Sequence, residues 1–169
     1  MTLERGKMKK LASKGTPSAV FVGIDDIAAI IKEQIALGQS VEMPPRGRSM
    51  LPTIREGRDS VILSPKTGKL KKYDIPFYRR HDGTYVLHRV VGFDGEGYIL
   101  SGDNQFILER GIGDDDVIAV VTGIRRRGRL IDVHNPIYLA CVKFWHLTRL
   151  PRYLIFRILR KIKRILTKH

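Results

Sequence analysis

Short β-prone runs separated by tight turns fill the chain from about residue 40 to residue 133. Glycine, proline and Asn/Asp turns punctuate these runs, which are SVEMPP, DSVILS, DIPFYRR, TYVLHRVVGF, GYILS, VIAVVTGI and RLIDV. Several short strands at such close spacing predict a small, coiled, mostly antiparallel sheet or a partly open barrel. The expected fold class is therefore mainly β.

Helical patterns flank this β region on both sides. In residues 24–37, apolar side chains recur at helical spacing, and Gly38 follows as a stop, which predicts one amphipathic helix packed on the sheet. Beyond Asn135-Pro136 the sequence again looks helical, with a break expected at Pro151. The chain therefore divides into three parts: a flexible basic arm (1–20), a domain (21–134) and a basic helical tail (135–169).

The chain is strongly basic, and much of the charge lies near its end. Its 169 residues include 31 Lys and Arg against 17 Asp and Glu, a net charge of +14. Nine basic residues follow Asp132, which is the last acidic residue. Such a balance favours an anionic partner, either nucleic acid or a phospholipid surface. A single cysteine, Cys141, excludes a disulfide framework and a multi-thiolate metal site, and suggests a reducing compartment.

The segment Gly-Arg-Ser-Met-Leu-Pro-Thr-Ile, residues 47–54, contains a serine that can act as a nucleophile. Ser49 lies between a glycine and a rigid proline, a setting that can hold its hydroxyl exposed at a sheet edge, but a serine needs a base to take its proton. Strand alternation places Val86, His88 and Val90 on one half-buried face, where a neutral imidazole can accept that proton. The structural alternatives are a plain turn serine and a core histidine.

A third polar residue, Asp103, lies in the turn Ser-Gly-Asp-Asn-Gln that closes the run GYILS. Glycine followed by Asp-Asn is a common turn signal, so a purely structural role is the alternative. A carboxylate at this place could also orient the histidine ring and stabilise its imidazolium form.

In this order, the Ser-Met-x-Pro-Thr box, the run ending in His-Arg-Val-Val-Gly and the Gly-Asp-Asn turn resemble the signal peptidase I / LexA-like serine peptidase family over about residues 40–130. The resemblance implies that Ser49 is the nucleophile and that its backbone N–H is an oxyanion-hole donor. It implies that His88 takes the general-base place, as in endoplasmic-reticulum and archaeal signal peptidases, where bacterial leader peptidases carry lysine. Asp103 matches the aspartate of the family's turn. Glu109 and the Asp114-Asp115-Asp116 cluster are candidates for a further acidic residue.

The resemblance implies a serine endopeptidase that cleaves a protein or peptide precursor without a cofactor or metal. A non-catalytic membrane- or nucleic-acid-binding module on the same fold is the alternative. A LexA-type repressor is disfavoured, because only about 40 residues and one clear helix precede the sheet, and because His88 stands in the lysine position. Signal peptidases have a transmembrane anchor before the serine box, where this chain has the helix at 24–37. That difference favours a stand-alone relative acting on the cytoplasmic side.

The tail from Arg152 onward combines an apolar helical stripe with a basic remainder of the helix. The basic residues expected to contact a surface are Arg157, Arg160, Lys161, Lys163 and Arg164. This pattern predicts an interfacial helix that lies on anionic lipid. Nucleic acid is a less favoured partner, since it would not need the continuous apolar stripe. We therefore expect a cytoplasmic protein held peripherally on the inner face of the membrane.

Overall fold

The computed structural model describes residues 24–95 and 97–166, so the expected basic arm over 1–20 lies outside the described residues. The first half of the chain contains α1 (Ile24–Ala36), β1 (Val41–Met43), β2 (Asp59–Ser64), β3 (Pro76–Arg79), β4 (Tyr85–Leu87) and β5 (Arg89–Asp94). The second half contains β6 (Gly97–Ser101), β7 (Glu109–Ile112), β8 (Val117–Arg126), β9 (Arg129–Asp132), α2 (Pro136–Leu147) and α3 (Arg149–Leu166). A short 3₁₀ turn at Asp114–Asp116 leads into β8.

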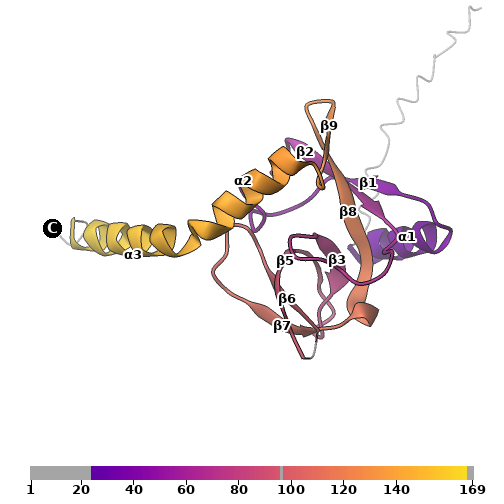
Figure 1. Ribbon diagram of the computed structural model, residues 1–169, viewed down its shortest axis with the longest axis horizontal. Helices are drawn as coiled ribbons and strands as arrows, with labels where there is room; N and C mark the ends of the chain where they lie inside the picture. The colour runs from indigo at the N-terminus through magenta and orange to yellow at the C-terminus, as the bar shows by residue number, and fades with distance from the viewer. Residues whose placement is uncertain (1–23, 96, 167–169) are drawn as a thin grey trace, which may run out of the picture.

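The strands form two antiparallel sheets (Figure 1). The larger sheet has six strands in the order β1-β2-β8-β3-β4, with β9 paired to the end of β8. The smaller sheet has three strands in the order β5-β6-β7. The prediction of a mainly β, antiparallel fold is confirmed. The described strands make two sheets and do not close into a barrel.

Two apolar cores lie on opposite faces of the larger sheet. Alternation along β3 places Phe77 in the core that α1 covers, and its neighbour Tyr78 in the core against the smaller sheet. Side chains of β8 alternate in the same way, so that Val121 lies in the first core and Val120 in the second. Ile31 of α1 is buried in the first core, as expected for one face of an amphipathic helix. The larger sheet is therefore the central layer.

All seven β-prone runs contain strands, but two details differ from the prediction. The run TYVLHRVVGF splits at His88, where the chain leaves the larger sheet as β4 and enters the smaller one as β5. β7 was not predicted, because Glu-Arg-Gly-Ile contains one apolar residue and shows no alternation. The split places His88 at the junction between the two sheets.

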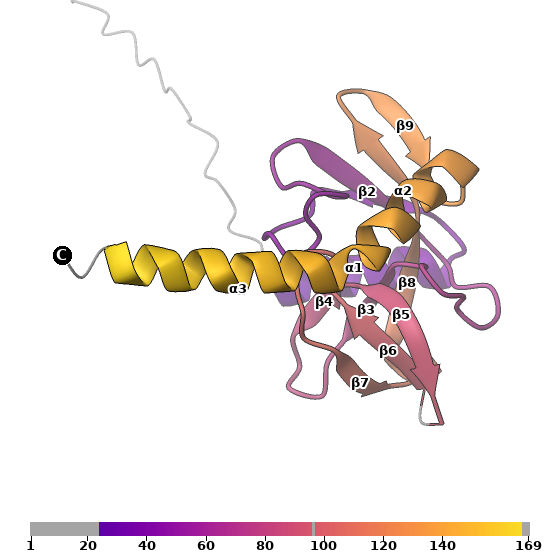
Figure 2. The same ribbon diagram turned by 60° about the vertical axis from the view of Figure 1, so that its left-hand side comes forward.

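The tail is helical as predicted, but its break is at Thr148 rather than Pro151. Asn135 caps α2 by accepting hydrogen bonds from the backbone N–H groups of Ile137 and Tyr138. Pro151 lies in the first turn of α3, where a missing N–H leaves no intrahelical bond unmade. α3 extends away from the sheets in both views (Figures 1 and 2). None of the described helices is both long and apolar enough to span a bilayer.

Candidate active site

The turn after β1 holds Ser49 at the surface of the larger sheet. Its neighbour Met50 and, one turn further on, Ile54 are buried in the first core, which anchors the segment on both sides of the proline. Gly47 has φ of +89°, a conformation that glycine adopts without strain, and its N–H donates to the Glu56 carboxylate at 3.0 Å. Ser49 itself is half-buried, so its hydroxyl can meet a ligand.

His88 is brought to Ser49 through the Gly102 turn. Arg89 pairs with Ser101 in the β5–β6 ladder, so His88 and Gly102 are the next positions at its end. A methyl group on Gly102 would lie 2.7 Å from the carbonyl oxygen of Ser49 and 3.0 Å from its Cβ, a distance that only glycine permits. The backbone N–H of Asn104 also donates to that carbonyl at 2.8 Å. The turn therefore packs directly against the serine segment.

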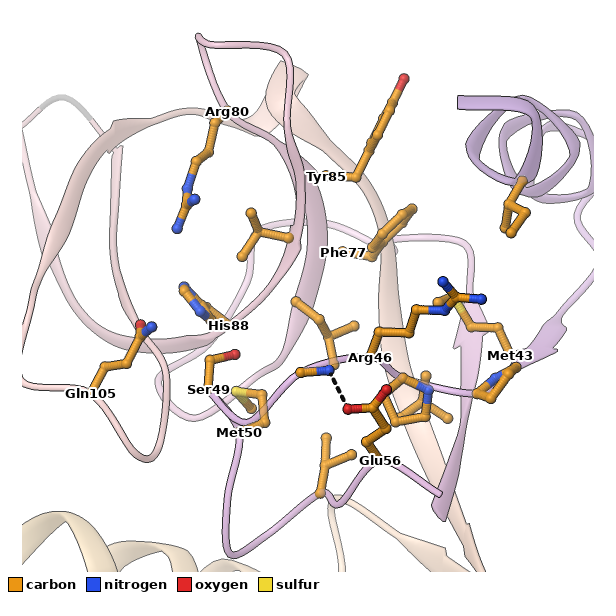
Figure 3. Close-up of a pocket in the computed structure, with 18 residues that line it drawn as sticks. Met43, Arg46, Ser49, Met50, Glu56, Phe77, Arg80, Tyr85, His88 and Gln105 are labelled. Atoms are coloured by element: carbon orange, nitrogen blue, oxygen red, sulfur yellow. Dashed lines mark hydrogen bonds between the residues drawn. The ribbon is translucent and has the colours of Figure 1, made fainter. Parts of the chain in front are cut away.

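Ser49 and His88 line the same pocket, whose volume is about 360 Å³ (Figure 3). Most of its wall is apolar and comes from residues of β1, the serine segment, β3 and β4, including Met43, Met50, Phe77 and Leu87. The two side chains are neighbours on this wall in Figure 3, and no hydrogen bond joins them in the described structure. This size and lining suit one or two apolar side chains of a ligand.

The carboxylate that contacts His88 belongs to Glu109. Its Oε1 lies 2.9 Å from Nδ1 of His88, and the Tyr78 hydroxyl lies 3.3 Å from the same nitrogen. Tyr78 also donates to Glu109 at 2.6 Å, and the Arg80 guanidinium forms a paired contact with both carboxylate oxygens. Glu109 is therefore held in place from three sides.

Burial and neighbouring charge fix the protonation states of this group. Burial lowers the pKa of His88, although the charge of Glu109 acts to raise it, so the neutral imidazole is favoured at neutral pH. Burial acts to raise the pKa of Glu109, but hydrogen bonds from Arg80 and Tyr78 outweigh it and keep the pKa below its usual value. An ionised Glu109 only accepts hydrogen bonds, so the single proton of neutral His88 lies on Nδ1.

Nε2 of His88 is then the free basic nitrogen. No hydrogen bond joins it to another described residue, although His88 is only 2% exposed. Within the same part of the chain, no buried side-chain nitrogen or oxygen lacks a partner. Nε2 is therefore accessible, and because His88 lines the same pocket as Ser49, it is the nitrogen available to accept a proton there.

Asp103 lies close by but is part of a different cluster. Its carboxylate forms two hydrogen bonds of 2.8 Å with Arg89, and both side chains are fully buried. It also accepts from Thr53 and lies 3.0 Å from Nε2 of His146 in α2. Although burial opposes it, the Arg89 charge holds the pKa of Asp103 well below its usual range. The expected Asp103–His88 contact is not formed, and Glu109 occupies that place.

Two further groups at the site can contact a ligand: the backbone N–H of Ser49 and the side chain of Gln105. The backbone N–H of Ser49, expected as an oxyanion donor, has no acceptor among the described residues and remains available. Gln105, which sequence reasoning missed, lines the pocket, and its side chain is turned toward His88 in Figure 3. The described residues contain no cluster of three or more His, Cys, Asp or Glu that could hold a metal ion.

The basic surface expected on the tail is described only at its start. Arg157 is exposed on α3. The backbone of Arg160, Lys161, Lys163 and Arg164 is helical, but their side chains lie outside the described residues.

No protein-family model, curated protein or solved structure matches the chain. The resemblance seen in the sequence therefore stays an expectation, and function has to be inferred from the residues and their geometry.

Proposed function

We propose that the protein is a serine endopeptidase of the signal peptidase type, with Ser49 as nucleophile, His88 as general base and Glu109 as the group that orients it. One observation carries this proposal. His88 has its Nδ1 engaged by a fixed carboxylate and its Nε2 free of hydrogen bonds to the described residues, and it lines the same pocket as Ser49. A base held by a third group beside a serine is the arrangement that activates a hydroxyl for attack.

The proposed reaction has two halves. Oγ of Ser49 attacks the scissile carbonyl carbon, its proton passes to Nε2 of His88, and the carbonyl electron pair moves to oxygen, beside the Ser49 N–H. Collapse of this intermediate breaks the peptide C–N bond, and the leaving amine takes the proton from His88. Water then attacks the acyl-enzyme with the same base, releasing the carboxylic acid and restoring the serine. No hydrogen bond joins Ser49 and His88 in this structure, and we expect one to form when substrate binds.

Glu109 stabilises the imidazolium that forms in each half-reaction. The carboxylate lies 2.9 Å from Nδ1, on the side of the ring away from Nε2. Its negative charge stabilises the positive charge that the ring gains when Nε2 takes the serine proton. Arg80 and Tyr78 hold the carboxylate still, which avoids reorganisation during the step. Asp103 supports the serine segment through the Gly102 turn and has no direct part in proton transfer.

The position of the pocket favours an extended peptide as substrate. β1 and β4 are the two edge strands of the larger sheet, and both contribute to the pocket wall. An unpaired edge can bind an extended segment through backbone hydrogen bonds, while the pocket takes alternate side chains. The apolar lining selects apolar side chains near the scissile bond.

We also propose that the tail holds this peptidase at an anionic membrane surface, on its cytoplasmic face. The exposed Leu154, Ile155 and Ile158 of α3, together with a sequence that contains no acidic residue after Asp132, support this location.

Labelling with a serine-reactive fluorophosphonate, followed by peptide mapping, tests the catalytic proposal. We expect one adduct, on Ser49, that Ser49→Ala and His88→Ala abolish and that Ser40→Ala, a change at an exposed serine outside the pocket, leaves intact. An adduct on another serine overturns the assignment. If no adduct forms and no member of an apolar-rich peptide library is cleaved, the protein is a binding module on a peptidase-like fold.

A further inference from the structure

An exposed apolar stripe runs along both tail helices. Fourteen large hydrophobic residues are exposed in the described part of the chain, and seven of them lie on α2 and α3. Ile137, Phe144 and Leu147 of α2 follow one another at intervals of seven and three, and Leu154 and Ile158 of α3 are four apart. Residues at these spacings share one side of a helix. We call these five residues, with Ile155, the α2–α3 stripe.

Contacts on the opposite side of α2 fix the direction of this stripe. Val142 is buried, and the Trp145 indole N–H donates to the Asp103 carbonyl at 2.8 Å. His146 reaches the Asp103 carboxylate, and the Tyr138 hydroxyl accepts from Arg89 at 3.0 Å. Because these side chains face the sheets, the α2 part of the stripe must face away from them. Figure 2 shows α2 lying over the sheets, with α3 leading away.

Charge identifies the surface that covers the stripe. No acidic residue follows Asp132, whereas nine basic residues do, and among them Lys143 and Arg157 are exposed. A second copy of this face would bring two sets of like charges together, which opposes self-association through it. Nucleic acid would satisfy the basic residues and leave the apolar side chains in water. An anionic lipid surface satisfies both kinds of residue.

We infer that α2 and α3 together form one lipid-binding face, and that α2 itself lies on an anionic bilayer surface. This inference rests on the proposed membrane-bound peptidase and extends its contact from the tail tip to the helix that supports the catalytic segment. The stripe from Ile137 to Ile158 covers 22 residues of two successive helices, and amphipathic helices of this length are typical of segments that lie in the interface plane. The membrane-bound helix thereby contacts the Asp103 turn, which packs against the Ser49 segment.

Vesicle co-sedimentation of the full chain tests this face. The probes are vesicles of phosphatidylcholine with phosphatidylglycerol, and vesicles of phosphatidylcholine alone. The key variant is Phe144→Asp/Leu147→Asp on α2, and its matched control is Phe93→Asp/Leu130→Asp, an exposed Phe and Leu on β5 and β9. We expect wild type and the control to bind the anionic vesicles alike. The α2 variant should bind roughly tenfold or more weakly, since apolar side chains are lost from the interface.

The remaining outcomes separate this inference from the proposals on which it rests. If the α2 variant binds like wild type while Leu154→Asp/Ile158→Asp does not, α3 alone is the anchor and the inference is overturned. It is also overturned if RNA competes fully for binding, or if the α2 variant abolishes a concentration-dependent dimer instead. Fluorophosphonate labelling without lipid reports on Ser49 independently. If labelling fails while vesicle binding is intact, the peptidase proposal is rejected and the lipid-binding face of α2 and α3 stands.

Discussion

Replacing Asp103 by asparagine separates the two acidic residues near His88. The amide would keep the size of the side chain but leave the Arg89 guanidinium, which is fully buried, without its counter-charge. Removing one partner of a buried ion pair costs about 3–5 kcal/mol, a large part of a total stability of about 5–15 kcal/mol. With a urea m-value of about 2 kcal/mol/M, the unfolding midpoint should fall by about 1.5–2.5 M.

Glu109→Gln is the matched comparison and should show the reverse pattern. The side chains of Glu109 and Arg80 are 18% and 34% exposed, so water can solvate the Arg80 guanidinium after the substitution. The free energy of unfolding should therefore change by about 1 kcal/mol or less. Turnover should fall by roughly 10²–10⁴, because the imidazolium loses its stabilising charge. Urea unfolding followed by circular dichroism, and the rate of fluorophosphonate labelling, measure the two effects separately.

The opposite result would refute this division of roles. If Asp103→Asn keeps its urea midpoint but loses labelling, while Glu109→Gln labels normally, then Asp103 orients the base as the sequence suggested. Acid unfolding gives an independent check. Because the pKa of Asp103 is lowered in the folded state, its contribution is fully present above the unfolded pKa of about 3.9 and is lost as the pH falls toward the lowered value. Asp103→Asn should remove this part of the pH dependence.

Three further predictions concern the catalytic group. Ser49→Ala and His88→Ala should each abolish peptide cleavage, and the double variant should be barely worse than either, because the two residues act as a unit. Since burial lowers the pKa of His88 and the neutral form is the base, kcat/KM should rise with pH, with the midpoint of the rise below pH of about 6.5. Glu109→Gln should move this midpoint to lower pH, because the carboxylate raises that pKa. Gly102→Ala should slow Ser49 labelling at least roughly tenfold, because its methyl group would meet the Ser49 carbonyl at 2.7 Å, whereas Gly95→Ala, with open space around it, should have no effect.

Local patterns predicted most of the secondary structure of this chain. The seven β-prone runs and the helix at 24–37 were found because alternation and helical periodicity are properties of neighbouring residues. Alternation also separated the cores correctly around β4, since Val86 packs with the second core and Tyr85 and Leu87 with the first. These features need no knowledge of which strands pair.

Arg89 shows where this reasoning ends. Strand alternation puts Arg89 on the face opposite His88 and Val90, and an arginine is normally exposed. The break at His88 instead directs Arg89 into the molecule, where it meets a carboxylate that lies 14 residues further along the chain. Their meeting depends on the β5–β6 register, which pairs Arg89 with Ser101. A single sequence does not contain that register in any local pattern.

The same limit explains why Glu109 was left as one candidate among several. Its position beside His88 depends on β7, which pairs with β6 through a register shift between Tyr98 and Leu100. The signal that could have found it is chemical: a buried histidine base needs an acceptor for its second nitrogen. Asp103 was the nearer acidic residue in the sequence, but the buried Arg89 uses its charge.

The role of Asp103 connects the catalytic segment to the proposed membrane face. Trp145 and His146 hold the Asp103 turn from α2, and that turn contacts Ser49 through Gly102 and Asn104. Tyr138 of α2 also packs against the core that contains Met50 and Ile54, so the docking of α2 and the position of the serine segment are linked. A surface that binds the outer face of α2 restrains this helix on the side that the sheets leave open. Lipid binding and the geometry of the Ser49 segment are therefore expected to stabilise each other, since each favours the same placement of α2.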